Sequence, residues 1–195
     1  LACVLRPSDR DPASVVSALI KRLLVPLRRA WPKTKIIVRA DSGFCRPRVL
    51  QRLERWRVSY IIGLQKNSRL NEQVALAELA LAEQYTAKKT KQRMFGEFQY
   101  AAGTWDKARR VIARLEHGEQ GANPRYIVTD LPGSPKALYE RRYCARGEAE
   151  NRIKEAQLDL FGRRASCHRF PAHPPRLLLA ALAYPLLLTL RRLGF

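Results

Sequence analysis

Residues 143–157 read YCARGEAENRIKEAQ, and the interpretation of the whole chain is built outward from them. If this stretch is helical, a rotation of about 100° per residue puts Tyr143, Arg146, Glu150, Lys154 and Gln157 on one strip roughly 80° wide. Apolar residues fall on an adjoining arc, and the other charged residues point away from both. A single carboxylate among cations therefore stands at the border of a packed face.

Spacing alone leaves two interpretations of this strip open. In the first, Arg146 with Glu150 and Glu150 with Lys154 form ion pairs four residues apart, each contributing a few tenths of a kcal/mol to the helix. In the second, the strip is a functional surface. Spacing by itself favours the ion pairs.

A second informative stretch is residues 35–44, KIIVRADSGF. Its β-branched residues predict a buried strand over 35–40, and Asp41 follows directly, before a Ser-Gly pair that allows a tight turn. Open α/β sheets place their chemistry at the carboxyl ends of central strands, so Asp41 is a candidate site residue. The alternative, an Asx turn or a helix cap, is slightly favoured by these residues alone.

The two stretches together resemble a known family. Tyr143, Arg146 and Glu150 stand in the order Y-x2-R-x3-E-x6-K, with Gln157 where that pattern has its lysine. Over nearly its whole length the chain resembles bacterial insertion-sequence transposases of the DDE class, and two motifs in the right order are more specific than one. The resemblance implies an α/β fold, a ribonuclease-H-like mixed sheet flanked by helices, with a β-rich insertion.

The resemblance also implies roles for individual residues. Asp41 and Glu150 become the catalytic residues and the ligands of two divalent ions, Mg²⁺ or Mn²⁺, which take oxygen ligands. Contacts with DNA are implied for Tyr143, Arg146, Lys154, Gln157 and Arg39. The first catalytic aspartate of such enzymes lies upstream of Leu1, so we expect an N-terminally truncated fragment.

The composition fits a polyanionic partner. The chain has 195 residues, 46% of them apolar, enough for one sizeable core. Thirty-seven Lys and Arg against seventeen Asp and Glu leave a net charge of +20, which phosphate groups of nucleic acid would neutralise. A ribosomal or otherwise nonspecifically basic protein would carry the same excess. Four scattered cysteines without a CxxC pair predict reduced thiols in a cytoplasmic protein.

Two functions follow from these observations. The first is a transposase catalytic domain that cleaves and transfers DNA strands during transposition of an insertion sequence, inactive as this fragment alone. Its partners would be double-stranded DNA at the transposon ends and the target, and a second copy of the chain on that DNA, near the bacterial nucleoid. The second is a non-catalytic basic DNA-binding protein or a decayed transposase remnant.

Periodicity predicts the order of the first elements. An apolar face at helical spacing predicts a helix that begins at Pro12, is kinked or broken at Pro26 and ends before Pro32. The next elements are the strand over 35–40, a helix over 47–56 and a strand over 58–64. Such an alternation predicts parallel strands in one α/β layer.

After residue 64 the pattern changes. The predicted elements are a helix over 70–85 and three antiparallel strands over 95–101, 109–115 and 125–129. We therefore predict three regions. They are residues 1–64, the first part of the catalytic core; 65–137, the β-rich insertion; and 138–195, the C-terminal helices that carry Glu150.

Three further expectations concern single features. The basic run over 88–93, with Lys107, Arg109 and Arg110, could track a DNA backbone beside Trp105 or Tyr100, and a solvated basic loop explains it equally well. Asp130 is a rival carboxylate for which we favour a turn role. The apolar tail over 176–190 is too short to span a membrane and contains Pro185, so we expect a buried helix.

Overall fold

The computed structural model describes residues 13–145, 147, 151, 153–155 and 173–194. The chain divides into two compact units, Asp11–Ala145 and a unit that joins Leu1–Arg10 to Arg146–Phe195. Some predictions fall outside the described residues. These are the helix start at Pro12 and most of the helix over 143–157.

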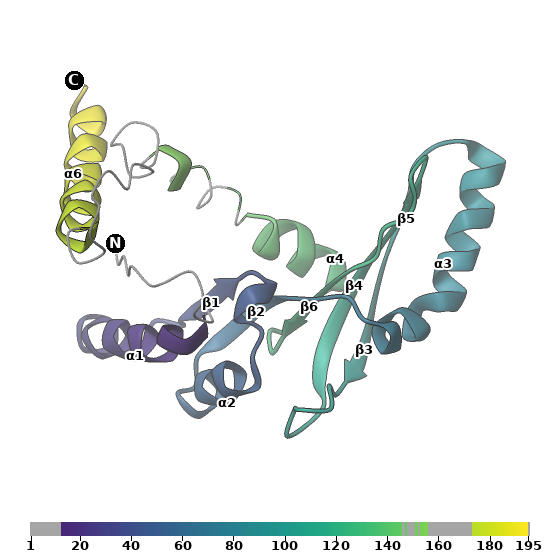
Figure 1. Ribbon diagram of the computed structural model, residues 1–195, viewed down its shortest axis with the longest axis horizontal. Coiled ribbons are helices and arrows are strands. Elements are labelled where there is room, and N and C mark those ends of the chain that lie inside the picture. The colour runs from purple at the N-terminus through teal and green to yellow at the C-terminus, as the bar shows by residue number, and fades with distance from the viewer. Residues whose placement is uncertain (1–12, 146, 148–150, 152, 156–172, 195) are drawn as a thin grey trace. The chain divides into compact units, whose positions relative to one another are not determined.

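One mixed sheet organises the larger unit (Figure 1). Its strands are β1 (Ile37–Ala40), β2 (Ser59–Leu64), β3 (Gln92–Tyr100), β4 (Arg109–Gly118), β5 (Gly121–Ala122) and β6 (Arg125–Thr129). The order is β1-β2-β6-β4-β3, and β5 pairs with the end of β4. The pair β1–β2 is parallel, and every other pair is antiparallel. The mixed α/β fold class is therefore confirmed.

The first half of the sheet follows the predicted strand–helix–strand order. The helix α2 (Pro47–Arg55) joins β1 to β2, and Val49, Leu50 and Leu53 turn one helical face into the core. Because β2 lies between β1 and β6, its residues are buried from Tyr60 to Gly63. The predicted parallel pair is confirmed.

The preceding helix, α1 (Ala13–Ala30), corrects one prediction. Pro26 does not break it, since α1 continues through Pro26 to Ala30. A proline removes one backbone donor, and burial of Leu24 with a bond from Arg28 to the carbonyl of Trp56 holds the last turns in place. The helix ends before Pro32, as predicted, because the residue before a proline is pushed out of the helical region.

The predicted antiparallel meander is also confirmed, and it continues the first half of the sheet. The long helix α3 (Ser68–Lys88) begins with the side chain of Asn67 accepting a bond from Leu70 N at 3.0 Å, and leads to β3. β6 then pairs with β4 on one side and with β2 on the other. β1 and β2 lie before the predicted boundary at residue 64, and β3, β4 and β6 lie after it, so strands from both sides of the boundary form one sheet.

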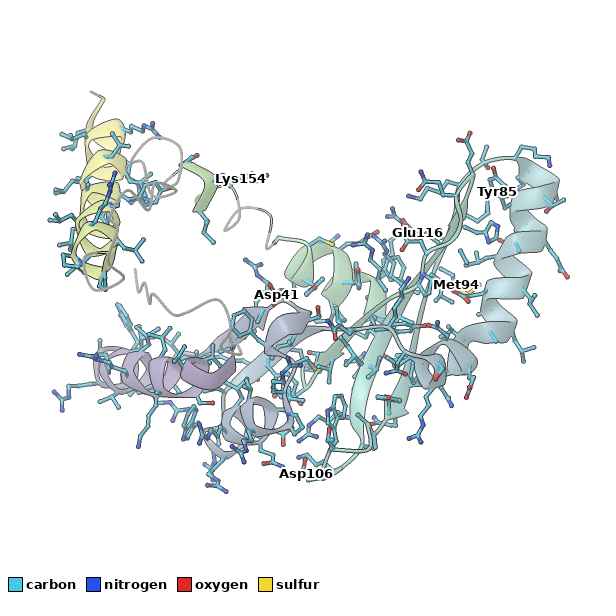
Figure 2. All side chains as sticks on the ribbon, viewed as in Figure 1. Asp41, Tyr85, Met94, Asp106, Glu116 and Lys154 are labelled. Atoms are coloured by element: carbon cyan, nitrogen blue, oxygen red, sulfur yellow. The ribbon has the colours of Figure 1, made fainter. Side chains whose placement is uncertain are left out.

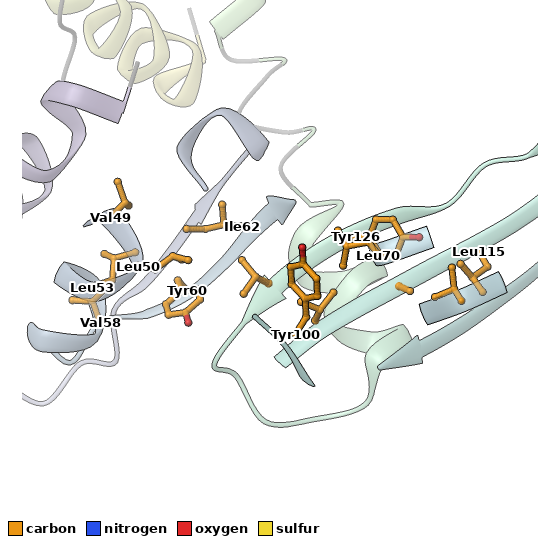
Figure 3. Packing of buried hydrophobic residues seen from close by; sticks show 14 of the residues in the cluster. Val49, Leu50, Leu53, Val58, Tyr60, Ile62, Leu70, Tyr100, Leu115 and Tyr126 are labelled. Atoms are coloured by element: carbon orange, nitrogen blue, oxygen red, sulfur yellow. The ribbon is translucent and has the colours of Figure 1, made fainter. Parts of the chain in front are cut away.

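Alternating side chains of this sheet build two cores. On one face Tyr60, Ile62 and Val128 belong to a cluster that also includes residues of α1, α2 and α3 (Figure 3). On the other face Ile61 and Ile127 pack with Leu131 and with residues of the π-helical turn η2 (Leu138–Tyr143), which follows the short helix α4 (Pro135–Ala137). The period of two along each strand separates the two clusters.

The smaller unit contains the helix α6 (His173–Leu193). Its existence is confirmed, but Pro185 lies inside it without ending it. Tyr184 is buried and donates a bond to Glu155 Oε2 at 2.8 Å. The expectation of a buried helix is wrong for Leu178, Leu182 and Leu186, which are more than half exposed. None of the described helices is both long and apolar enough to cross a membrane.

Candidate functional site

The candidate site lies where β1 and β2 end. Asp41 follows β1 in an extended conformation, and its Oδ1 accepts a bond from Gly43 N at 2.9 Å. This bond caps the short 3-10 turn η1 (Ser42–Phe44). The predicted Asx-type turn is therefore present, and it fixes an exposed carboxylate at the carboxyl end of a strand (Figure 2).

Gly63, near the end of β2, is the neighbour of this turn. Ala40 pairs with Ile62, so the next residues along the two parallel strands are Asp41 and Gly63. A Cβ atom at Gly63 would lie 2.6 Å from Tyr143 Oη, 2.9 Å from Ser42 N and 3.3 Å from the carbonyl carbon of Asp41. The Tyr143 hydroxyl thus occupies the space over Gly63, directly beside Asp41 and Ser42.

Aromatic contacts hold Tyr143 there. Its ring centroid lies 5.4 Å from that of Tyr139, and Tyr139 in turn lies 5.7 Å from Phe95 of β3. The guanidinium of Arg114 lies 5.4 Å from the centre of the Tyr139 ring. Each aromatic pair stabilises its geometry by about 0.5–1.5 kcal/mol beyond simple burial. The half-buried ring of Tyr143 is therefore positioned before any ligand binds.

Arg39 ties the same two segments together. Its Nη1 donates a bond to the carbonyl oxygen of Arg142 at 2.8 Å, which links β1 to the last turn of η2. Arg39, Asp41 and Tyr143 come from distant parts of the sequence. The structure gathers these three predicted residues around one end of the sheet.

The remaining predicted residues are not part of this arrangement. Arg146, Glu150 and Gln157 lie outside the described residues. Lys154 is exposed and belongs to the smaller unit. The predicted approach of Glu150 to Asp41 therefore stays a prediction.

The donors at this end of the sheet suit a hard cation. An exposed carboxylate such as Asp41 is a ligand that Mg²⁺ accepts, and one carboxylate fills one of about six coordination positions. Within the described part of the chain no three His, Cys, Asp or Glu side chains come together as a ligand set. Asp41 would thus share a metal ion with groups from elsewhere.

The rival carboxylate Asp130 has a structural role, but its side-chain bond is to a distant strand and is not the local turn contact that the sequence predicted. Its Oδ1 accepts a bond from the backbone N of Tyr60 at 2.7 Å. Tyr60 is near the start of β2 and Gly63 is near its end, so Asp130 and Asp41 lie at opposite ends of that strand.

The predicted DNA track over 88–93, with Lys107, Arg109 and Arg110, is wrong for Arg109, which is buried, and stays a prediction for the exposed cations. Several of its cations form ion pairs within the protein. Arg109, with a side chain only 2% exposed, bonds Glu54 at 2.7 Å and Asp106 at 2.8 Å. Arg109 also lies 5.3 Å from the Trp105 ring centre. Lys107 pairs with the same Glu54 at 2.9 Å. Burial alone would raise the pKa of Glu54, but hydrogen bonds from Arg109, Lys107 and Tyr60 outweigh it and leave that pKa below its ordinary value.

A second group of cations surrounds Glu116, which is buried in β4. Its carboxylate contacts Lys91 at 3.3 Å, Arg93 at 2.6 Å and Arg114 at 2.8 Å. Burial would raise the pKa of Glu116, and the bond from Arg93 with the charge of Arg114 lowers it below its usual range. Arg110 is likewise bonded to Glu97. Several cations of this region are therefore already paired with carboxylates, although the side chains of Lys91 and Arg93 remain 60% and 44% exposed.

Sequence reasoning missed Gly63 and the aromatic residues Phe95 and Tyr139. A signal for Gly63 was present, since a glycine inside the apolar run SYIIGL of β2 often marks a close approach of another group. No local sequence pattern indicates a site role for Phe95 or Tyr139, and both are typical of residues in a hydrophobic core.

Comparison with known proteins gives one match. The family model described as "Transposase DDE domain group 1" matches residues 1–195. No curated protein and no solved structure matches the chain.

Proposed function

We propose that this chain, which belongs to the transposase DDE domain group 1 family, is a catalytic domain that cleaves and transfers DNA strands. The observation that carries the proposal is the arrangement of side chains at the carboxyl ends of β1 and β2. There the exposed Asp41 stands beside the hydroxyl of Tyr143, a residue of the Y-x2-R-x3-E motif.

In this proposal Asp41 and Glu150 bind divalent ions. Two such ions, about 4 Å apart, would activate the attacking oxygen and stabilise the leaving oxygen of the phosphodiester. The bond from Gly43 N occupies one side of the Asp41 carboxylate and fixes its orientation. A fixed carboxylate needs little reorganisation to bind a cation, which favours a preformed site.

Tyr143 and Arg39 would contact DNA beside the metal ligands. The Tyr143 ring is half-buried and held by Tyr139, so its hydroxyl is a positioned donor for a phosphate oxygen. Arg39 uses Nη1 on the Arg142 carbonyl, and a guanidinium has further N–H groups that can face a phosphate. We assign Arg146 and Gln157 to DNA from the motif, and Lys154 because it follows Glu150 by four residues and can replace the missing lysine at a phosphate.

The proposed architecture is a ribonuclease-H-like core. Its support is the parallel pair β1–β2 with the candidate carboxylate at the carboxyl end. In this scheme residues 1–64 and 138–195 form the core, and residues 65–137 form a β-rich insertion whose strands extend the core sheet. Transposon ends, target DNA and a second copy of the chain are the proposed partners, in the cytoplasm at the nucleoid.

A second candidate function is DNA binding without catalysis. The observations that favour it are the net charge of +20 and the uncharged Gln157 at the lysine position of the motif. Such a decayed transposase would bind DNA but would cut no strand.

Matched substitutions separate the two functions. In the protein that contains this chain, Asp41→Asn and Glu150→Gln should each abolish Mg²⁺-dependent strand cleavage and leave DNA binding nearly unchanged. The control is Asp130→Asn, which retains the oxygen that accepts from Tyr60 N and lies at the other end of β2. Its cleavage activity should persist. Cleavage by Asp41→Asn at the unsubstituted rate would remove Asp41 from the mechanism.

A further inference from the structure

The helices α1 and α2 carry an unbalanced positive surface. No acidic residue occurs in α1, and the single one in α2, Glu54, is bonded to Arg109 and Lys107. The two helices carry seven cations, Lys21, Arg22, Arg28, Arg29, Arg48, Arg52 and Arg55. Their charge therefore has no neutralising partner on these helices.

A cleft lies within this surface. It has a volume of about 370 Å³ and is lined by Ser17, Ala18, Lys21, Arg52, Arg55 and Trp56. Trp56 is half-buried and packs against the core, whereas the three cations are exposed. Arg28 of α1 donates to the carbonyl oxygens of Trp56 and Arg57, which fixes the two helices beside the cleft.

The cations of the cleft differ from those of the β-strands. Within the described residues no ion pair joins Lys21, Arg52 or Arg55 to a carboxylate. Arg109 and Arg93, by contrast, are bonded to Glu54 and Glu116. A polyanion would thus bind these cations of α1 and α2 without breaking an internal ion pair.

We propose that this cleft binds single-stranded DNA, with one unpaired base against the Trp56 indole and the neighbouring phosphates on Lys21, Arg52 and Arg55. Sites for single strands combine a basic groove with an aromatic face on which a base can stack. The cleft volume is at the lower end of the range of about 300–1,000 Å³ for small-ligand sites, a size that suits one nucleotide. A second indole, Trp31, is 59% exposed and directly follows α1.

The aromatic wall favours a single strand over a duplex. Bases in a duplex are paired and stacked on each other, so none of them has a free face that could stack on an indole inside a cleft. The inference rests on the proposed function, because strand cleavage and transfer are the steps that expose unpaired DNA. It adds a site between α1 and α2, built from residues that the motif does not contain.

The test measures binding by the whole 195-residue chain to a labelled oligothymidine and to a labelled duplex of equal length. EDTA is present, so that no strand is cut. The variant Lys21→Gln/Arg52→Gln/Arg55→Gln removes the cations of the cleft. The control, Lys66→Gln/Arg69→Gln/Lys136→Gln, removes the same charge from exposed positions outside the cleft.

We expect the cleft variant to bind the single strand at least roughly 10-fold more weakly than the control does. Its slope of log K against log salt should fall by about 2, at about 0.7 for each lost phosphate contact. Trp56→Leu should weaken single-strand binding by roughly 5-fold or more, with an unchanged salt slope. These outcomes support the cleft as a single-strand site.

Equal weakening by the two triple variants would overturn the proposal, since the effect would then be one of net charge. A loss of duplex binding as large as the loss of single-strand binding would overturn it as well. The proposed catalytic function is decided separately by cleavage in Mg²⁺ with Asp41→Asn. If one of the two proposals fails its test, the other can therefore still be tested.

Discussion

Replacing Gly63 by alanine tests whether Tyr143 occupies the end of β2 beside Asp41. The added methyl group would lie 2.6 Å from Tyr143 Oη and 2.9 Å from Ser42 N. Both distances are shorter than a normal contact of a Cβ atom. The tyrosine hydroxyl ends a side chain that can move, but Ser42 N belongs to the backbone of the turn that orients Asp41. The substitution should thus disturb both halves of the candidate site.

The expected cost follows from two opposing terms. Overpacking a filled site costs about 1–3 kcal/mol, and alanine returns about 0.5–1 kcal/mol of the backbone entropy that a glycine in a strand loses. Gly63 has a negative φ, so alanine meets no backbone strain there. The free energy of unfolding of Gly63→Ala should fall by about 1 kcal/mol, or about 2–4 °C in the unfolding midpoint.

The assay is urea unfolding followed by tryptophan fluorescence, with Gly96→Ala as the matched control. Gly96 is also inside a strand, β3, and a Cβ atom added there would meet nothing within 4 Å. That control should be as stable as the parent protein or slightly more so. Tyr143→Phe, which removes the hydroxyl, should recover part of the cost of Gly63→Ala in a double-mutant cycle. A zero coupling energy, together with a Gly63→Ala protein as stable as Gly96→Ala, would refute the placement of Tyr143.

Three further predictions concern the ion pairs and DNA. Glu54→Gln should lower the free energy of unfolding by about 3 kcal/mol in urea titrations, because buried Arg109 keeps Asp106 but loses the carboxylate that bonds its Nε and Nη2. Glu97→Gln, at a more exposed pair, should cost at most about 1 kcal/mol, and equal costs would contradict this reading. The folded-state pKa values of Glu54 and Glu116 are lowered, so their stabilisation is complete above the unfolded pKa near 4.5 and is lost as pH falls through the folded values. Unfolding measured between about pH 6 and pH 3 should show this loss, and it should be smaller in Glu116→Gln. Affinity for duplex DNA should fall steeply between about 50 and 200 mM salt, and a flat titration would argue against binding through phosphates.

Most secondary structure could be predicted from local patterns. Apolar residues at helical spacing marked α2, and β-branched runs marked β1 and β2 with Asp41 at the right end. These predictions succeeded because the hydrophobic period of an element depends only on residues a few positions apart. The break that Pro26 could have caused does not occur, since α1 continues to Ala30, and Pro185 likewise lies inside α6.

The sequence by itself determined the order of helices and strands, the surplus of positive charge, and the motif residues Asp41 and Tyr143. Only the tertiary structure placed the Tyr143 hydroxyl over Gly63, buried Arg109 against Glu54, and brought Lys21, Arg52 and Arg55 to one cleft between α1 and α2. The physical reason is the distance along the sequence over which each interaction acts. Hydrophobic periodicity depends on residues a few positions apart. Strand register and the pairing of charges depend on which distant segments pack together, and no local pattern predicts that.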